Sequence, residues 1–594
     1  MKTYYPVRSR SIAIMLIIPL LFFSCKKDSV TENNGTYSAA LQDIQSKISS
    51  TVTGFVTGET GQPVSGATVY AGNASTRTDQ FGYFEIKNAT QTQNAALVTV
   101  VQPGYFKGIK TYIANPDEDA FLRIKLIPKI TTGSFYGITG GSILVNKGLQ
   151  ISFIPNGVVN ASTGAIYSGL VNVAAFWIDP AAPDLYRIMP GDLRGVNTSG
   201  ELKGLTTFGM AAVELTGTSG ELLQIAPGKK ATLNISIPAA KLPYAPMTVP
   251  LWYLDELTGL WTEQGIAARS GNSYSGEVSH FSFWNFDEAS SFVRFSCSLI
   301  DIAGNPLKNT LVKISLAGNP NAAGYGFTNG NGYVNGAVPA HAALTLVVEG
   351  EEQCGTPVYV QNFMTTFNDI SLGTIKVNAL AGLATVSGKI TGCSNNSVAN
   401  GSVIMQKNNQ FYRFPAGADG TYNFTTPICS GTADVELMGY DAATTQYGNP
   451  VNYSITTNKS TRADLVACGN TSSLFVNYTI NGTLYSFTYP ADQFSPETPD
   501  RLFTFMVSNI HREEAGFQFS LADNAGNCAR PLTYFRASQL NTTLTAVSPI
   551  SVNLTEKGEN DQVFAGNFSG SFTGPAPGNK LFNINCSFRV KCQL

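Results

Sequence analysis

Apolar and polar residues alternate with a period of two at the start of the stretch Val52–Phe84. This alternation over Val52–Thr57 predicts a strand with one buried face. A turn is predicted at Thr78–Gly82, because an Asp side chain can accept a hydrogen bond from the backbone two residues on and Gly tolerates a positive φ. Glu59–Pro63 is predicted to be an earlier turn, and the remaining strands are predicted at Val64–Tyr70, Tyr83–Ile86, Leu97–Val101 and Leu122–Ile127.

The same stretch carries a set of motifs in a fixed order. Gly61-Gln62-Pro63-Val64-Ser65-Gly66-Ala67-Thr68-Val69 is followed by Thr78-Asp79, Gly82-Tyr83-Phe84 and Gly104-Tyr105. Residues 52–128 therefore resemble the carboxypeptidase regulatory-like family. The resemblance implies a transthyretin-like β-sandwich that is an accessory domain without catalytic activity of its own.

Weaker copies of the pattern follow. Thr328–Val334 parallels Thr78–Phe84, and Asp419–Phe424 repeats the same turn and strand further on. These copies predict a second regulatory-like β-sandwich over residues 291–380 and a third over residues 381–469. Three related sandwiches in one chain favour an arrangement like beads on a rod, suited to a spacer or display role.

Two other segments also read as β-structure. Residues 129–290 contain Met189–Leu193, Pro250–Glu256 and Val278–Asn285 in an order that resembles a β-rich extracellular module of Bacteroidota lipoproteins. The order is also similar to the module beside the regulatory-like domain in cartilage intermediate layer proteins. Asn481-Gly482 between alternating runs indicates a hairpin in a C-terminal β-sandwich over residues 470–594. The fold class expected is all-β, with tandem β-sandwich domains of transthyretin-like or Ig-like type.

The N-terminus has the layout of an export signal. Positive residues precede an apolar run, Ile12–Phe23, that is shorter than the roughly 20 residues of a membrane-spanning helix. Cys25 follows directly, so residues 1–24 resemble a bacterial lipoprotein signal peptide in which Cys25 is acylated. Phe22-Phe23 departs from the usual signal box but resembles Bacteroidota lipoproteins. The alternative is an ordinary secretory signal with an incidental cysteine.

The resemblance to a lipoprotein signal peptide implies a cellular location. Residues 25–50 would form a polar tether, and the acyl chain would attach the protein to the outer membrane. Lys27-Asp28 resembles the charged signals that send such lipoproteins to the cell surface. The expected partners are the membrane, through this anchor, and a glycan or protein ligand.

The charge of the chain argues against nucleic acid as a partner. Charged residues are 13% of the chain and the net charge is −2, so no basic surface for nucleic acid is expected. No cofactor is expected either.

Eight cysteines follow Cys25, which in an exported chain favours disulfides. Pairing within a repeat predicts Cys297 with Cys354 and Cys393 with Cys429, while the last four, at 468, 528, 586 and 592, allow more than one pattern. Free buried thiols are the alternative. A zinc site is not expected, because the chain has no C-x-x-C and no Cys/His cluster.

Three tryptophans, Trp252, Trp261 and Trp284, offer the clearest candidate binding residues. Two interpretations stay open: they stabilise a sandwich core, or they form a sugar-stacking platform.

The other candidates suggest no catalytic site. His511 and Glu514 have the H-x-x-E spacing of the metallocarboxypeptidase zinc site, but no second histidine follows. His280 is expected to be a packed strand residue and His341 a turn residue. Asp117–Asp119 is expected to be surface charge, with Ca²⁺ binding as the alternative.

No catalytic residue is therefore predicted, and the chain is expected not to be an enzyme. The function expected is adhesion, structural display or ligand binding at the cell envelope. The alternatives are a polysaccharide-binding accessory lipoprotein and a hydrolase with an unrecognised site, since paired carboxylates need no local spacing.

Overall fold

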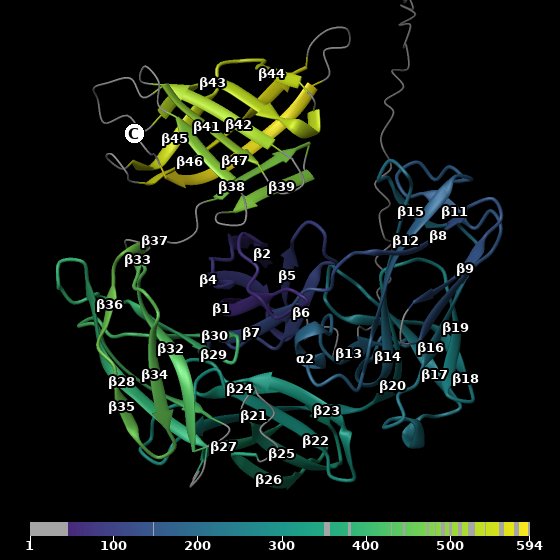
Figure 1. The fold of residues 1–594 in the computed structure, drawn as a ribbon. Helices are drawn as coiled ribbons and strands as arrows, with labels where there is room; N and C mark the ends of the chain where they lie inside the picture. Colours follow the sequence, from purple (N-terminus) through teal and green to yellow (C-terminus); the bar gives the residue numbers. More distant parts are fainter. Residues whose placement is uncertain are drawn as a thin grey trace, which may run out of the picture.

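The structure is a computed structural model. It describes residues 46–145, 148–349, 357–377, 382–428, 431–443, 446–471, 475–481, 483–488, 493–497, 502–508, 514–520, 529–540, 542–557, 563–574 and 581–591. Strands dominate these residues, and α2 (Leu185–Ile188) is the one α-helix among them. None of the described helices is long and apolar enough to cross a bilayer. The fold class predicted from the sequence is confirmed: the chain is an all-β protein built of tandem β-sandwich modules (Figure 1).

The first module packs two sheets around one core. One sheet has the order β4-β1-β7 and the other β3-β2-β5-β6. β1 is antiparallel to β4 and parallel to β7. The alternation that predicted β1 places Val52 and Val56 in the core, where neither is exposed. The elements are β1 (Lys47–Thr57), β2 (Thr68–Ala71), β3 (Ala74–Arg77), β4 (Tyr83–Thr92), η1 (Gln93–Ala95), β5 (Ala96–Val101), β6 (Gly108–Tyr112) and β7 (Ala120–Lys125).

The third and fourth modules repeat this topology. In the third the sheets run β24-β21-β27 and β23-β22-β25-β26, and in the fourth β28 is again antiparallel to one neighbour and parallel to the last strands. The third comprises β21 (Phe292–Ile300), β22 (Leu311–Leu316), β23 (Asn319–Phe327), β24 (Tyr333–Pro339), β25 (Ala343–Glu349), β26 (Tyr359–Met364) and β27 (Ile370–Lys376). The fourth comprises β28 (Leu383–Gly392), β29 (Ser402–Lys407), β30 (Gln410–Pro415), β31 (Thr421–Pro427), β32 (Thr432–Asp441), β33 (Gln446–Tyr447), β34 (Val451–Thr456), β35 (Ser460–Arg462), β36 (Leu465–Ala467) and β37 (Asn470–Thr471).

The repeat extends to individual turn hydrogen bonds. Asp79 Oδ1 accepts from the backbone N–H groups of Phe81 and Tyr83, both at 2.9 Å. Asn329 Oδ1 accepts in the same way from Asn331 at 2.8 Å and Tyr333 at 2.9 Å. Gly82 and Gly332 end these turns with a positive φ. A Cβ on either glycine would lie 2.4 Å from a backbone oxygen of the module's first strand, that of Val56 in β1 or of Leu299 in β21. The parallel between these two turns, predicted from the sequence, therefore rests on a shared geometry.

The second module is a 13-stranded sheet folded around two cores. Its strands are β8 (Thr131–Tyr136), β9 (Gly141–Val145), β10 (Leu149–Phe153), β11 (Val158–Asn160), β12 (Leu170–Ile178), β13 (Arg194–Val196), β14 (Leu202–Thr216), β15 (Leu222–Ile225), β16 (Ala231–Ser236), β17 (Thr248–Leu254), β18 (Trp261–Ser270), β19 (Ser273–Val278) and β20 (Phe283–Ser290), with a turn of 3-10 helix, η2 (Leu242–Tyr244), between β16 and β17.

The fifth module is a ten-stranded sheet with an aromatic core. Its strands are β38 (Phe475–Ile480), β39 (Thr483–Thr488), β40 (Gln493–Glu497), β41 (Leu502–Ser508), β42 (Glu514–Ser520), β43 (Ala529–Ala537), β44 (Thr542–Ala546), β45 (Ser551–Lys557), β46 (Val563–Thr573) and β47 (Leu581–Lys591), with η4 (Ser538–Leu540) after β43. β38 and β39 form the hairpin predicted from Asn481-Gly482.

The modules do not lie along a rod, so that expectation is wrong. The second, third and fourth modules surround the first (Figure 1). Phe81 of the first module packs in one buried cluster with Ile404, Met438 and Tyr440 of the fourth. The modules pack together because their outer faces carry aromatic, arginine and amide side chains that find partners on neighbouring modules.

The disulfide pattern also differs from the prediction. Cys393 is bonded to Cys468, not to Cys429, and Cys297 is a free, buried thiol rather than the partner of Cys354. Parallel pairing of β28 with β36 places Gly392 beside Ala467, so the next residue of each strand is a cysteine at the same end. β31 runs the opposite way and finishes beside the start of β28, far from Cys393. Cys354 and Cys429 themselves lie outside the described residues, as does Cys25.

Candidate functional site

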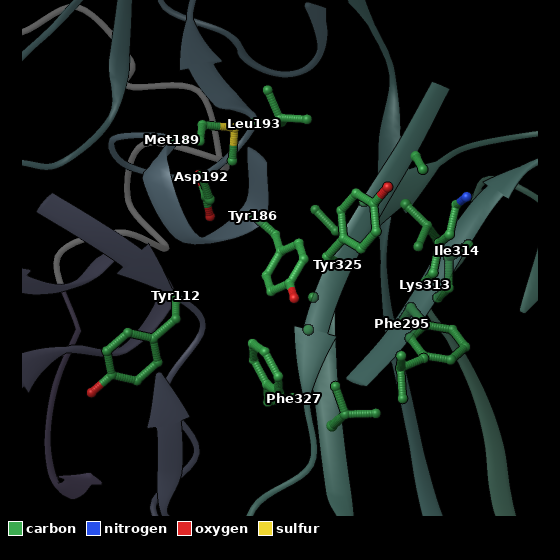
Figure 2. A pocket seen from close by; sticks show the side chains of 18 of the residues that line it. Tyr112, Tyr186, Met189, Asp192, Leu193, Phe295, Lys313, Ile314, Tyr325 and Phe327 are labelled. Atoms are coloured by element: carbon green, nitrogen blue, oxygen red, sulfur yellow. The ribbon is translucent and has the colours of Figure 1, made fainter. Parts of the chain in front are cut away.

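A cavity of about 650 Å³ lies where the first three modules meet (Figure 2). Its walls come from β6 and β7 of the first module, from α2 and the loop after it in the second, and from β22, β23 and β24 of the third. Because these segments lie between residues 110 and 339, only the packing of modules brings them together. The volume falls within the range of small-molecule sites, which is about 300–1,000 Å³.

Aromatic rings form one side of this junction cavity. Tyr186 projects from α2, with its ring centroid 5.2 Å from that of Tyr325 and 5.6 Å from that of Phe327 on β23 (Figure 2). Phe327 also contacts Phe121 of β7 at 5.7 Å. Tyr325 stays more than one third exposed, so its ring is accessible from the cavity. Aromatic faces of this kind suit a flat or apolar ligand.

A buried lysine closes the side toward the first module. Lys110 Nζ donates to the backbone oxygens of Tyr186 at 2.8 Å and Met189 at 2.6 Å. Burial lowers the pKa of Lys110 to about 7, and the Asp192 carboxylate opposes part of that shift. The amine thus satisfies carbonyls at the end of α2 and fixes the position of Tyr186.

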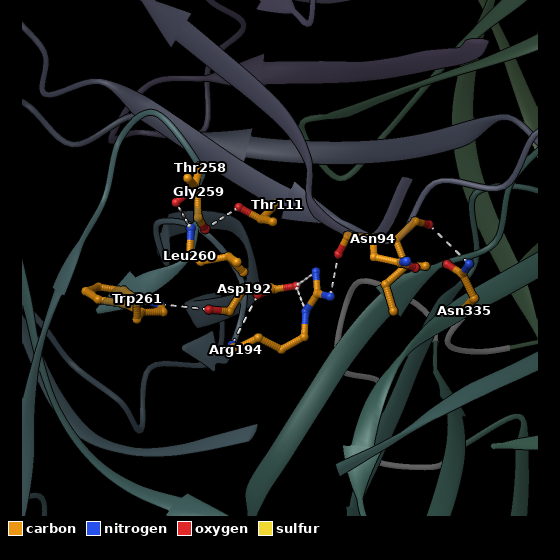
Figure 3. A network of polar contacts seen from close by, with 10 residues as sticks. Asn94, Thr111, Asp192, Arg194, Thr258, Gly259, Leu260, Trp261 and Asn335 are labelled. Carbon is orange, nitrogen blue, oxygen red and sulfur yellow. Dashed lines mark hydrogen bonds and ion pairs between the residues drawn. The ribbon is translucent and has the colours of Figure 1, made fainter. Parts of the chain in front are cut away.

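The loop that follows α2 is held by a polar network (Figure 3). The Arg194 guanidinium contacts the Asp192 carboxylate at 2.6 Å and donates to the Asn94 backbone oxygen, also at 2.6 Å. Burial raises the pKa of Asp192, while Arg194 acts against that rise. Trp261 Nε1 donates to the Asp192 backbone oxygen at 2.7 Å. The hydrogen bond from Arg194 to Asn94 therefore ties the second module to the first, and the ion pair with Asp192 holds the loop in the cavity wall.

The acidic stretch Asp117–Asp119 helps join the first and third modules. Asn329 Nδ2 donates to Glu118 Oε2 at 2.6 Å and to the Asp119 backbone oxygen at 2.9 Å, and Asn331 Nδ2 donates to the same Glu118 oxygen at 3.0 Å. Amide groups thus occupy one oxygen of the Glu118 carboxylate. Within the described ranges no group of three or more His, Cys, Asp or Glu side chains is placed to hold a metal ion.

A buried carboxyl lies behind the cavity wall of the second module. Asp287 is fully buried, and its Oδ2 accepts a hydrogen bond from Asn285 Nδ2 at 2.5 Å. Thr207 Oγ1 donates to Asn285 Oδ1 at 2.9 Å. Burial raises the pKa of Asp287 well above its usual value of 3.8, against smaller opposing effects of Thr207 and Lys241. The folded protein therefore holds this proton more tightly than the unfolded chain does.

This raised pKa predicts the behaviour of Asp287→Asn. The carboxyl contributes stability that is fully present below about pH 4 and is lost as the pH rises through the folded pKa. An amide is neutral at every pH and can keep the acceptor oxygen facing Asn285. The variant should gain about 1–3 kcal/mol in free energy of unfolding at pH 8 over the parent chain, and little at pH 4. Urea denaturation at both pH values measures the difference, with the exposed Glu277→Gln as control. Equal gains in free energy of unfolding at both pH values would contradict the predicted role of the Asp287 carboxyl.

The three tryptophans are core residues, which agrees with the first of the two interpretations and contradicts the sugar-stacking platform. Trp252, Trp261 and Trp284 all have no exposed surface. Each indole N–H donates to a backbone oxygen, at 3.2 Å to Asp287, 2.7 Å to Asp192 and 2.9 Å to His280 respectively. A buried, satisfied indole cannot stack on a sugar.

The histidines are not brought into the cavity. His280 packs between Tyr253, at 4.7 Å, and Trp284, at 5.1 Å between ring centroids. Burial lowers the pKa of His280, which favours the neutral ring. His341 has a φ of 50° in a turn and stacks on Phe367 at 5.4 Å. His511 lies outside the described residues.

Sequence reasoning missed the residues that line the cavity. Tyr325 lies between Gly324 and Gly326 on β23, and none of the motifs considered above includes this run. Tyr112, Tyr186 and Phe327 carried no motif at all. An aromatic residue flanked by glycines on a strand is the one local signal that marked this wall.

The fold is that of a multi-module β-sandwich protein with a cavity between its modules. No family model matches the chain. Human cartilage intermediate layer protein 2 is 33% identical over 121 residues, which are 20% of this chain and 10% of that protein. The mouse protein of the same name is 27% identical over 226 residues, 36% of this chain and 19% of that protein. The matches thus span only a tenth to a fifth of the length of these curated relatives.

Two pilins are among the solved structures that part of the chain matches. The shaft pilin SpaA of Lactobacillus rhamnosus GG is 9% identical, covers 30% of this chain and 99% of its own, and has a TM-score of 0.16. The minor pilin GBS52 of Streptococcus agalactiae is 9% identical, covers 29% of this chain and 94% of its own, and has a TM-score of 0.13. At these values the likeness adds nothing to the all-β class that the strands already define.

Proposed function

We propose that this protein is a non-catalytic component of the cell envelope that binds a small apolar or aromatic molecule between its modules. The observation that carries the proposal is the cavity, with its aromatic wall of Tyr186, Tyr325 and Phe327. The principal polar groups around it, Lys110, Asp192 and Glu118, already have hydrogen-bond partners within the protein. They fix the shape of the site and are not arranged to transfer protons to a ligand.

The location proposed follows the sequence. Acylation of Cys25 would attach the chain to the outer membrane, with residues 25–50 as tether and the modules facing outward. In this proposal the first, third and fourth modules are regulatory-like domains that serve as a scaffold. Adhesion and display remain compatible with the same scaffold, whereas the polysaccharide-binding alternative loses the exposed tryptophan row on which it depended. Mass spectrometry of the N-terminal peptide tests the acyl group on Cys25.

Filling the cavity should weaken ligand binding. Ala323 lines the cavity on β23 and is separated from Tyr325 by one residue, so the two side chains share a strand face. Ala323→Phe should weaken binding of the neutral fluorescent probe N-phenyl-1-naphthylamine at least about tenfold, because the ring takes the ligand's volume. Fluorescence titration measures the affinity for the parent chain and the variant.

Two tyrosine variants serve as a matched pair. Tyr325→Ala removes an aromatic face of the cavity and should weaken binding of the probe. Tyr70→Ala removes a tyrosine that is 46% exposed on the first module and should leave probe binding unchanged. Equal binding by the parent chain, Ala323→Phe and Tyr325→Ala would reject the cavity as the binding site.

A further inference from the structure

The charged side chains that line the junction cavity are mostly basic. Five basic residues stand against three acidic ones: Lys110, Arg123, Arg194, Lys241 and Lys313 against Glu118, Asp119 and Asp192. A cavity lined by an excess of one sign of charge attracts ligands of the opposite sign. The wall therefore favours a ligand that carries negative charge.

Four of the five basic groups direct their donors at the protein itself. Lys110 and Arg194 make the contacts described above. Lys241 Nζ donates to the Asn321 backbone oxygen at 3.0 Å, and Arg123 Nη2 donates to a backbone oxygen of the fourth module, also at 3.0 Å. These four groups hold the cavity wall in shape.

Lys313, the fifth basic residue, lies on the aromatic wall of the cavity. Its cross-strand neighbours are Tyr325 on β23 and Val347 on β25, neither of which is acidic. Val312 is buried in the third module's own core, so Lys313 next to it lies on the opposite face of β22, which it shares with Tyr325. The side chain is half-buried there and lines the cavity.

The Lys313 ammonium group lies beside the Tyr325 ring (Figure 2). Nζ is 6.0 Å from the ring centroid, the outer limit of a cation–π contact. Within the part of the chain that the structure describes, no oxygen accepts a hydrogen bond from this Nζ. An ammonium group has three N–H donors and a ring face satisfies none of them fully, so they are available to a ligand that lies against Tyr325.

We propose that the ligand of the junction cavity is an aromatic acid, whose ring lies against Tyr325 and whose carboxylate or sulfonate accepts hydrogen bonds from Lys313 Nζ. This inference rests on the proposed function, because it assigns the chemistry of the ligand that the cavity binds. A hydrogen bond between an ammonium and an anionic oxygen is about twice as strong as one between neutral groups. One such polar contact in an otherwise aromatic site fixes the orientation of a ligand and selects its charge.

Two fluorescent probes with the same rings test the charge preference. 8-Anilinonaphthalene-1-sulfonate is N-phenyl-1-naphthylamine with one added sulfonate, so the ratio of the two affinities isolates the effect of the anion. Lys313→Met removes the charge at nearly constant side-chain length, and the ratio of sulfonate to neutral affinity should fall about tenfold relative to the parent chain. Lys313→Arg keeps the charge and should keep the ratio within about threefold. Fluorescence titration at pH 7 measures both affinities.

Lys376→Met is the matched control, because Lys376 is an exposed lysine of the same module that does not line the cavity. A ratio that falls in Lys313→Met and not in Lys376→Met supports the aromatic acid. An unchanged ratio in Lys313→Met, or an equal fall in both variants, overturns it and leaves the proposed function standing, because the neutral probe tests the cavity alone. Equal binding of the neutral probe by the parent chain, Ala323→Phe and Tyr325→Ala rejects the cavity as the site, and with it the aromatic acid.

Discussion

Replacing Trp261 with alanine should destabilise the second module by about 3–5 kcal/mol, the usual cost of deleting a fully buried tryptophan. Trp261 lies in a core shared by two modules, which includes Ile109 of the first and Met210 and Trp252 of the second. Its N–H also satisfies the Asp192 backbone oxygen, so the loss leaves both a void and an unpaired carbonyl. Urea denaturation measured by intrinsic fluorescence should show the midpoint fall accordingly.

Trp261→Phe is the matched control. It keeps most of the ring volume and loses the donor, so it should cost about 1–2 kcal/mol. Glycan binding by Trp261→Ala shows whether Trp261 acts as a core residue or as a residue that contacts a glycan. If Trp261→Ala kept the parent stability and lost binding of a glycan, the tryptophan would have to be accessible, contrary to its burial.

The features that the sequence could predict are strands and turns encoded within a few neighbouring residues. Alternation at Val52–Thr57 and the Asp79 and Asn329 turns are encoded within a few residues, and each holds in the structure. The short strands β3 and β6 were missed because Ala74–Arg77 and Gly108–Tyr112 contain too few apolar residues to reveal a period. Their pairing comes from neighbours: β3 pairs with β2, and β6 with β5.

What the sequence could not predict depended on pairing across long separations. Cys468 bonds to Cys393 because β36 returns parallel to β28, a topology that spacing within a repeat does not reveal. The cavity depends even more on residues far apart in the sequence, because Tyr186 and Tyr325 approach each other only after the second and third modules pack on the first. Sequence patterns identify the modules' own cores, while the site belongs to the surfaces between them.

Arg123 is the residue on which that packing depends most visibly. It is 4% exposed on β7, with its guanidinium 5.1 Å from the Phe55 ring centroid, 6.0 Å from that of Phe327 and 4.7 Å from that of Tyr412. Nη2 donates to the Phe411 backbone oxygen at 3.0 Å. One side chain of the first module thus contacts both the third and the fourth.

Arg123→Ala should cost about 2–4 kcal/mol, because several cation–π contacts are worth about 0.5–2 kcal/mol each when desolvated and a buried carbonyl loses its donor. The loss falls between modules, so the fourth module should separate from the first. Small-angle X-ray scattering should then show a larger radius of gyration, and denaturation a second transition. Arg123→Lys keeps a charge near the rings but loses the planar donor fork, so it should have an intermediate effect.

The exposed Arg462→Ala, whose side chain is 76% exposed beside Asp464, should change neither measurement. If Arg123→Ala left the radius of gyration and the single transition unchanged, the aromatic and hydrogen-bond contacts elsewhere between these modules would suffice to hold them. The cavity would then owe its shape to other residues that bridge modules, among them Lys110, Arg194 and Asn329. Loss of N-phenyl-1-naphthylamine binding together with loosening in Arg123→Ala would instead tie ligand binding directly to the assembly of the modules.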